Sequence, residues 1–104
     1  MTNKILGMIG LAVRAGKVKF GVFLTLQACD ALKAKLVVIP CDIGQSNRRS
    51  IEAKCKATNT PCIAIADKES LSKAVGKKDT VALAVCDESF SSAILKLYGG
   101  GING

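Results

Sequence analysis

Two kinds of hydrophobic pattern alternate along the chain. Over residues 3–13, apolar side chains recur every three or four residues, which is the spacing of one buried helix face. Between residues 36 and 42 the apolar residues are consecutive, and such a short run is typical of a strand buried on both faces. Helices are predicted over residues 3–13, 22–33, 48–58, 68–75 and 87–98, and strands over 17–20, 36–42, 62–66 and 81–86.

Capping residues support this division at the fourth helix. Asp67 can cap its start, and Gly76 can end it in a left-handed conformation. Because helices and strands alternate without a linker, the sequence predicts an α/β fold, a three-layer αβα sandwich around a four-stranded sheet. We expect residues 1–98 to form a single domain and residues 99–104 to form a flexible Gly-rich tail.

The predicted helix over 22–33 is apolar nearly all round, so most of it should be buried. Phe23, Leu24 and Gln27 span one turn near its start, which leaves open an apolar surface at that point. Phe23 then has three alternative roles. The first is a core side chain, which is usual for an aromatic residue in an apolar helix. The second is a platform on which an unpaired base stacks, and the third is a contact to another protein.

Composition argues against several classes of function. Histidine is absent, so no His base is available to activate a Ser, Thr or Cys nucleophile. Gly16-Lys17 lacks the glycine spacing and the Ser or Thr of a P-loop. The closest two of the five cysteines, Cys55 and Cys62, are seven residues apart, whereas zinc sites usually contain closer ligand pairs. We therefore expect no enzyme, no metal site and no cofactor.

Four of the cysteines lie in or beside apolar runs and are expected to be buried thiols: Cys29, Cys41, Cys62 and Cys86. An odd number of cysteines without a secretion signal also argues against a disulfide framework. The first residues lack a signal peptide, and no apolar run is long enough to cross a membrane. A cytoplasmic protein without a membrane partner is expected.

The formal net charge of +7 is concentrated in a few segments. Residues 14–21 hold three cations and two glycines just before a predicted helix. Glycine lets a backbone approach a ligand closely, and a helix N-terminus presents N–H groups to anions, so this segment predicts a phosphate-binding edge. The alternative is that these lysines and arginines form only a solvated face.

Arg48 and Arg49 are expected to open the third helix, with Ser46 or Asn47 as its cap. Cations at a helix start oppose the macrodipole. Placing two arginines there destabilises the helix unless an anion is bound, which favours a ligand role for this pair.

An ordered set of residues across most of the chain resembles a bacterial family. It comprises Gly10-Leu11-Ala12, Arg14-Ala15-Gly16-Lys17, Gly21, Ala34-Lys35-Leu36-Val37, Asp42, Ser46-Asn47, Gly76-Lys77, Val81, Val85-Cys86-Asp87 and Phe90. With its gaps, this set resembles the YlxQ-type branch of the superfamily that contains the kink-turn-binding ribosomal proteins of archaeal and eukaryotic large subunits. The resemblance covers residues 5–98.

The resemblance implies a mixed sheet in the order 1-4-2-3, with strand 4 antiparallel to the others. Strands 1 and 2 would then end at the edge where strand 4 begins, so we expect the segments 14–21, 42–49 and 76–80 to converge. Together they hold seven Lys or Arg and two Asp. Clustered positive charge of this kind is typical of a nucleic-acid-binding surface.

An RNA-binding site is therefore predicted at this edge. The cations expected to contact phosphate are Arg14, Lys17, Lys19, Arg48, Arg49, Lys77 and Lys78. The glycines expected to permit close approach are Gly16, Gly21 and Gly76. Gln27 is expected to bond to a base edge.

In the kink-turn-binding relatives, a Gly-x-Asn-Glu-x-x-Lys run opens the second helix, and its polar pair reads the sheared G·A pairs of the bent RNA. This chain has Phe23 and Leu24 in place of Asn and Glu, and Gln27 in place of Lys. The loop before strand 4, apolar in those relatives, is Lys77-Lys78-Asp79. These differences remove the side chains that would hydrogen-bond to base edges and keep the cationic side chains that would contact phosphate groups.

The sequence thus predicts a monomeric, non-enzymatic RNA-binding protein. Its expected partner is ribosomal RNA or another structured RNA, kink-turn-like in form, with the ribosome as a further candidate. The alternative is a protein–protein interaction module, with a homodimer or partner surface around Phe23 and no specific RNA.

Overall fold

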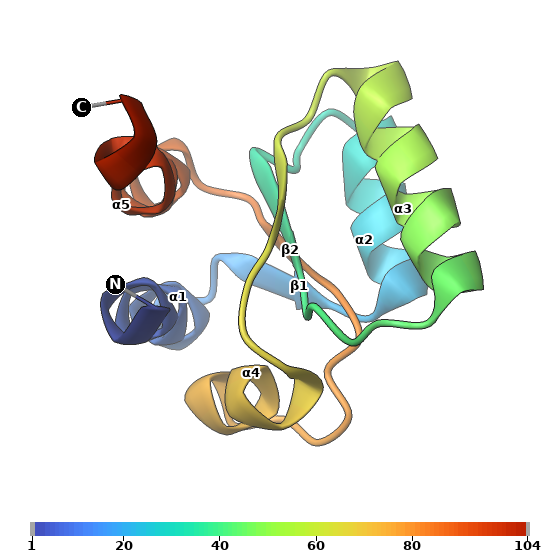
Figure 1. Ribbon diagram of the computed structural model, residues 1–104. Coiled ribbons are helices and arrows are strands. Elements are labelled where there is room, and N and C mark those ends of the chain that lie inside the picture. The colour runs from blue at the N-terminus through green and yellow to red at the C-terminus, as the bar shows by residue number, and fades with distance from the viewer. Residues whose placement is uncertain (1, 104) are drawn as a thin grey trace.

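The structure of the protein is a computed structural model that describes residues 2–103 (Figure 1). Its helices are α1 (Thr2–Arg14), α2 (Val22–Asp30), α3 (Gln45–Thr58), α4 (Lys68–Val75) and α5 (Glu88–Asn103). Its strands are β1 (Val18–Phe20), β2 (Leu36–Ile39), β3 (Cys62–Ala64) and β4 (Leu83–Val85). Each predicted helix and strand corresponds to one of these elements, with shifts at several ends.

The strands form one sheet in the order β1-β4-β2-β3. β2 and β3 are parallel, with Val38 opposite Ile63, whereas β4 is antiparallel to both of its neighbours, with Leu83 opposite Phe20 and Val38. β1, β2 and β3 therefore end at the edge of the sheet where β4 begins. The predicted mixed sheet with the order 1-4-2-3 is confirmed.

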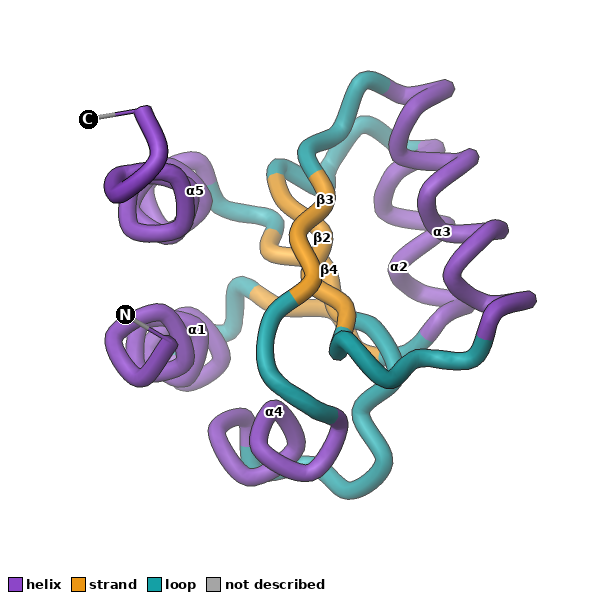
Figure 2. The backbone as a smooth tube through the Cα atoms, viewed as in Figure 1, coloured by secondary structure: helices purple, strands orange, loops and turns teal. Residues whose placement is uncertain are grey.

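Helices cover both faces of this sheet and produce three layers (Figures 1 and 2). Because successive strand residues point to opposite faces, Leu36 and Val38 pack in the core with α1, α4 and α5, while Val37 and Ile39 pack in the core with α2 and α3. All four are fully buried. This two-sided burial explains the uninterrupted apolar run in β2, and it confirms the predicted αβα sandwich.

The fourth helix has the predicted bounds because its capping signals are local. The Ser70 N–H donates to Asp67 Oδ1 at 2.7 Å at the start of α4, and Gly76 ends the helix with φ of 71°. The same hydrogen bond holds the pKa of the Asp67 carboxyl below its usual value.

The ends of α2 and α3 differ from the prediction. α2 ends at Asp30 instead of residue 33, because Leu32 adopts a left-handed conformation with φ of 59°. α3 begins three residues earlier than expected, since Gly44 in an extended conformation occupies the N-cap position. Ser46 and Asn47 therefore lie inside the helix, and their predicted capping role is wrong.

The last helix is longer than predicted. We expected it to end at Tyr98, whereas α5 continues to Asn103, so residues 99–103 of the predicted tail are helical. Gly104, the last residue of that tail, lies outside the described residues. The flexibility of the tail and the single domain over 1–98 stay predictions.

The glycines of α1 differ in their surroundings. A Cβ added at Gly10 would lie 3.1 Å from the carbonyl oxygen of Ala74 in α4, whereas one at Gly7 would meet nothing within 4 Å. Gly10 therefore permits a close approach of two helices. Within residues 2–103, no helix combines the length and the apolar character needed to cross a bilayer.

Candidate nucleic-acid interface

The edge at which β1, β2 and β3 end brings together two helix starts and one loop (Figure 2). The N–H of Gly21, between β1 and α2, donates to the carbonyl of Ala82 at 2.9 Å. α2 and α3 lie side by side and run in the same direction (Figure 1), and Lys54 Nζ contacts Asp30 Oδ1 at 2.8 Å between them. We call the surface made of residues 20–24, 44–49 and 76–82 the helix-start edge.

Neither helix start is capped by a side chain. Gly21 and Gly44 occupy the N-cap positions of α2 and α3, and neither helix has an acidic residue in its first turn. The first N–H groups of a helix have no partner inside the helix and carry a partial positive charge. Two such starts at one edge can bind anions, including phosphate.

The loop from Gly76 to Val81 lies against the start of α2. Lys77 Nζ is 5.1 Å from the centroid of the Phe20 ring, a cation–π contact between this loop and β1. The Thr80 N–H donates to Ser72 Oγ at 2.9 Å, which anchors the other end of the loop. A hollow of about 240 Å³ separates Gly21 from the loop, so Lys77 and Lys78 border the start of α2 as predicted.

The two arginines of α3 lie at this edge, but they do not open the helix. Because α3 begins at Gln45, Arg48 and Arg49 follow the N-cap by four and five residues. Arg48 Nε donates to Glu52 Oε2 at 3.2 Å, an exposed pair one helical turn apart. The macrodipole reason for an anion at this pair is therefore wrong for both arginines. Arg49 is exposed and forms no ion pair with any described residue.

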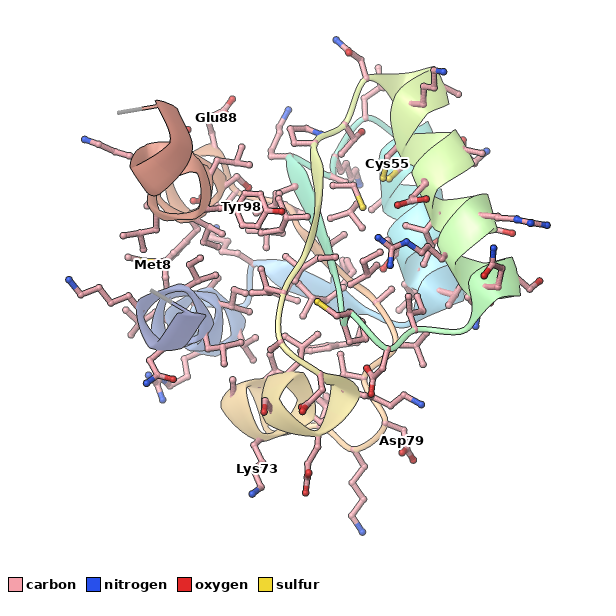
Figure 3. The ribbon with its side chains drawn as sticks, viewed as in Figure 1. Met8, Cys55, Lys73, Asp79, Glu88 and Tyr98 are labelled. Carbon is pink, nitrogen blue, oxygen red and sulfur yellow. The ribbon has the colours of Figure 1, made fainter. Side chains whose placement is uncertain are left out.

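A larger hollow of about 570 Å³ lies between α4 and the loops around it, and residues 76–79 of the helix-start edge line part of it. Lys68 and Lys73 line it, and sequence analysis did not single out either residue. Lys68 could have been predicted from the strand order, because α4, the helix after β3, also begins at this edge. Asp42 and Asp79 line the same hollow, so its charge is mixed; Figure 3 shows Asp79 on the loop after α4.

Arg14, Gly16 and Lys17 do not belong to this edge. They precede β1, and the Cys86 N–H, just after β4, donates to the Lys17 carbonyl at 2.8 Å. That bond places the turn between α1 and β1 at the opposite end of the sheet from Gly21. The prediction that the whole segment 14–21 converges with 42–49 and 76–80 is therefore wrong, because β1 itself separates its two halves.

Lys19 and Gln27 lie between the two ends of the sheet. Lys19 is the exposed middle residue of β1, opposite Ala84. Gln27 is exposed on α2, and both residues line a groove of about 400 Å³ beside this helix. Leu24 of the helix-start edge lines the same groove, so both residues lie next to that edge without belonging to it.

α2 reverses the usual distribution of apolar and polar side chains. Phe23 is 75% exposed and Leu24 is 41% exposed, whereas Thr25 is completely buried. The core role for Phe23 is therefore wrong. Its two remaining roles, base stacking and protein contact, both require an exposed ring.

The cysteines follow the prediction in part. Cys29 is buried, Cys62 and Cys86 are half-buried, and Cys55 is buried between α3 and the sheet (Figure 3). Cys41 is exposed, so its predicted burial is wrong: it follows β2 and Pro40, outside the sheet. A hydrogen bond to Cys62, together with burial, raises the pKa of the Cys55 thiol. Among the described residues no group of His, Cys, Asp or Glu is arranged to hold a metal ion.

Sheet order and helix placement define a class of protein. It is a small αβα sandwich whose 1-4-2-3 sheet presents two uncapped helix starts and a lysine-bearing loop at one edge. The model of the ribosomal protein L7Ae/L30e/S12e/Gadd45 family matches residues 3–95, and the chain belongs to this family. This membership confirms the expectation that the protein is not an enzyme.

Two proteins named RNA-binding protein YlxQ are similar to the chain over most of their length. The one from Bacillus subtilis (strain 168) is 29% identical over 90 residues, 86% of this chain and 90% of that relative. The one from Enterococcus faecium is 28% identical over 98 residues, 94% of each chain. The predicted YlxQ-type branch of the superfamily is confirmed.

Solved structures share the fold. A protein of unknown function from Bacillus halodurans C has a TM-score of 0.87 at 28% identity, with 90% of this chain and 95% of that chain covered. A 15.5 kD RNA-binding protein of Giardia lamblia has a TM-score of 0.77 at 18% identity, with coverage of 94% and 83%. At that low identity, the second likeness concerns the fold alone.

Proposed function

We propose that the protein binds RNA through the helix-start edge. Phosphate groups would lie at the starts of α2 and α3 and at the ammonium and guanidinium groups of Lys77, Lys78 and Arg49. The observation that carries this proposal is the pair of parallel helices that begin at one edge without a capping side chain or an acidic first turn.

The relatives support the same function. Both YlxQ proteins are named for RNA binding, and the similarity covers at least 90% of each of them. The net charge of +7 adds an electrostatic attraction to any polyanion. The RNA itself, an association with the ribosome, a monomeric state and a cytoplasmic location belong to the proposal.

Recognition of a kink-turn would be weak in this protein. Phe23 and Leu24 stand where the kink-turn-binding relatives have the Asn and Glu that read G·A pairs, and both side chains are exposed. Hydrocarbon side chains cannot bond to base edges, so discrimination between RNA shapes would depend on phosphate positions and on stacking at Phe23.

The test uses fluorescence anisotropy with two fluorescein-labelled RNA hairpins. One contains a kink-turn, and in the other its G·A pairs are replaced by Watson–Crick pairs. We expect the two dissociation constants to agree within about threefold, because the side chains of Phe23 and Leu24 cannot hydrogen-bond to the G·A pairs by which the two hairpins differ. If about five phosphates are neutralised, a plot of log K against log salt has a slope of about −3 to −5.

Charge variants locate the surface. Lys77→Gln with Lys78→Gln should flatten the salt slope by about 1.4 to 1.8, because each lost phosphate contact removes about 0.7 to 0.9. The matched control is Lys4→Gln with Lys96→Gln, which removes the same charge from α1 and α5. Equal effects of the two pairs, or a wild-type affinity that is flat in salt, would contradict the proposal.

Association with the ribosome is tested separately. The protein, detected by antibody in a sucrose gradient of cell lysate, should sediment with ribosomal particles and return to the top fractions in 0.5 M salt. Sedimentation as free protein under all conditions would leave RNA binding in place and remove the ribosome as partner.

A protein contact around Phe23 is the second candidate, and the exposure of Phe23 and Leu24 favours it. Sedimentation velocity distinguishes the two functions. RNA binding alone predicts a monomer whose sedimentation changes only when RNA is added. A dimer that persists in high salt and dissociates in Phe23→Asp would support the protein contact.

A further inference from the structure

The end of the sheet opposite the helix-start edge carries a second group of lysines. The Cys86 N–H donates to the Lys17 carbonyl on one side of β4, and the Lys35 N–H donates to the Val85 carbonyl on the other side, both at 2.8 Å. The turns before β1 and before β2 therefore flank the same strand end. Lys33 lies two residues before Lys35, and its N–H donates to the Ala28 carbonyl at 2.9 Å, which holds it against the end of α2.

A groove connects this end with the helix-start edge. It has a volume of about 400 Å³ and is lined by Leu24 in the first turn of α2, by Gln27 one turn further, and by Lys33 beyond the helix end. Lys19 of β1 and Cys86 form its other wall. With nine residues at about 1.5 Å each, α2 gives the groove a length of about 13 Å.

Positive charge dominates the groove. Its lining contains Lys19 and Lys33 and no carboxylate. The two acidic residues next to this lining in sequence are engaged elsewhere: Asp30 contacts Lys54 on the side of α3, and Asp87 Oδ2 accepts the Phe90 N–H at the start of α5.

The thiol of Cys86 lies near the same positive charges. Burial raises its pKa, and the charges of Lys19, Lys33 and Lys35 each lower it. Three ammonium groups therefore act on one point of the groove wall. None of the three lysines forms an ion pair with a described residue, although Lys35 also lines a neighbouring hollow with Glu88. Cations gathered in this way repel one another, and a bound polyanion would relieve that repulsion.

We propose that Lys19, Lys33 and Lys35 form a second contact surface for the phosphate backbone of RNA, so that one RNA crosses the molecule along α2 from the helix-start edge to the opposite end. This inference rests on the proposed function, and it adds a binding surface that the helix-start edge does not contain. Arg14 is left out of it, because a cation in the last turn of α1 already complements the helix dipole.

The first test compares salt slopes, with the fluorescein-labelled kink-turn hairpin as the probe. Lys33→Gln with Lys35→Gln should flatten the slope by about 1.4 to 1.8, as the equivalent pair at Lys77 and Lys78 does. The control pair at Lys4 and Lys96 should change it by much less, and Lys33→Arg with Lys35→Arg should keep the wild-type slope. Thermal unfolding by circular dichroism checks that each variant is folded.

The second test uses Cys86 as an internal probe in a Cys41→Ser background, which removes the exposed thiol. The rate at which N-ethylmaleimide modifies Cys86, followed by peptide mass spectrometry, should fall at least fivefold when the hairpin is bound. Protection should be lost in Lys33→Gln with Lys35→Gln at RNA concentrations that still saturate the helix-start edge.

The outcomes separate the two proposals. Wild-type RNA binding with an unprotected Cys86 and an unchanged slope in Lys33→Gln with Lys35→Gln would overturn the second surface and keep the first. The same result would follow if the groove binds an acidic protein segment. Absence of any RNA binding by the wild-type protein would overturn the proposed function itself.

Discussion

Thr25 lies in an environment that does not suit its hydroxyl group. Its side chain is completely buried in α2, and Oγ1 has no hydrogen-bond partner among the described residues. A hydroxyl that loses water without gaining a partner destabilises the folded state by about 1 to 3 kcal/mol.

Thr25→Val should therefore raise the free energy of unfolding by about 1 kcal/mol, because valine has nearly the same shape and no hydroxyl. Urea titration followed by circular dichroism measures the change. Thr25→Ser is the control: it keeps the hydroxyl, loses the methyl group and should be less stable than wild type. A loss of stability in Thr25→Val would mean that the hydroxyl is bonded, for example to water.

The glycines of α1 provide a matched pair. Gly7→Ala should stabilise the protein by about 0.5 to 1 kcal/mol, since alanine favours a helix and its methyl group would meet nothing within 4 Å. Gly10→Ala should gain less than Gly7→Ala or lose stability, because its methyl group would press on the Ala74 carbonyl. Thermal melts of the two variants decide this. Equal gains would show that α4 moves aside without cost.

The exposure of Phe23 could not be predicted from the pattern. A helix that is apolar nearly all round has no polar face, so the spacing does not indicate which side chains face the solvent. Burial of Thr25 in place of Phe23 contradicts the preference of each residue, and such conflicts are typical of functional surfaces. Base stacking or a protein contact would account for it at Phe23.

At the scale of elements, the start of α3 links stability to function. Gly44 has φ of −62° and ψ of 145°, a conformation open to other residues, and an added Cβ would meet nothing within 4 Å. The protein therefore lacks a capping side chain at a position that would accept one. An anion bound at the helix start would take the place of that cap.

Gly44→Asp tests this idea. The carboxylate should cap α3 and raise the free energy of unfolding by about a few tenths of a kcal/mol, while it repels phosphate and weakens RNA binding. Gly44→Ser supplies a cap without charge and should bind RNA more tightly than Gly44→Asp. Anisotropy and urea titration measure the two effects. Wild-type affinity in Gly44→Asp would show that phosphate does not occupy the α3 start.

Local signals decided which elements were predicted well. α4 has its predicted bounds because Asp67 and Gly76 act within one turn of its ends. The start of α3 was predicted too late because the N-cap there is an extended glycine, which has no side chain that would mark the position in the sequence. The earlier start places Arg48 and Arg49 beyond the first residues of the helix and removes the expected conflict with the macrodipole.

At the scale of the whole molecule, sheet order was predicted and the basic surface only in part. Lys77, Lys78, Arg48 and Arg49 lie at the expected edge, whereas the segment 14–21 extends over the length of β1. β1 has only three residues, but it separates Lys17 from Gly21, so that the two lie at opposite ends of the sheet. Lys33 and Lys35 were not predicted as binding residues, because only the fold brings their turn next to the start of β1.

The absence of histidine predicts a pH-independent interaction. Histidine is the side chain whose ordinary pKa lies between pH 5.5 and 7.0, and burial raises the pKa of the Cys86 thiol further above this interval. The RNA dissociation constant should therefore stay within about a twofold range over this interval. Anisotropy at constant ionic strength checks it. A tenfold change would require a titrating group that the proposed contacts do not contain.

The parallel arrangement of α2 and α3 also gives the electric field of the molecule a direction. Their aligned peptide dipoles add, with the positive pole at the helix-start edge, while Lys33 beyond the end of α2 offsets the negative pole. A protein with such a field rotates during diffusion and meets a polyanion in a preferred orientation. This steering acts over the Debye length, about 8 Å at physiological ionic strength, so it would speed encounter most in dilute salt.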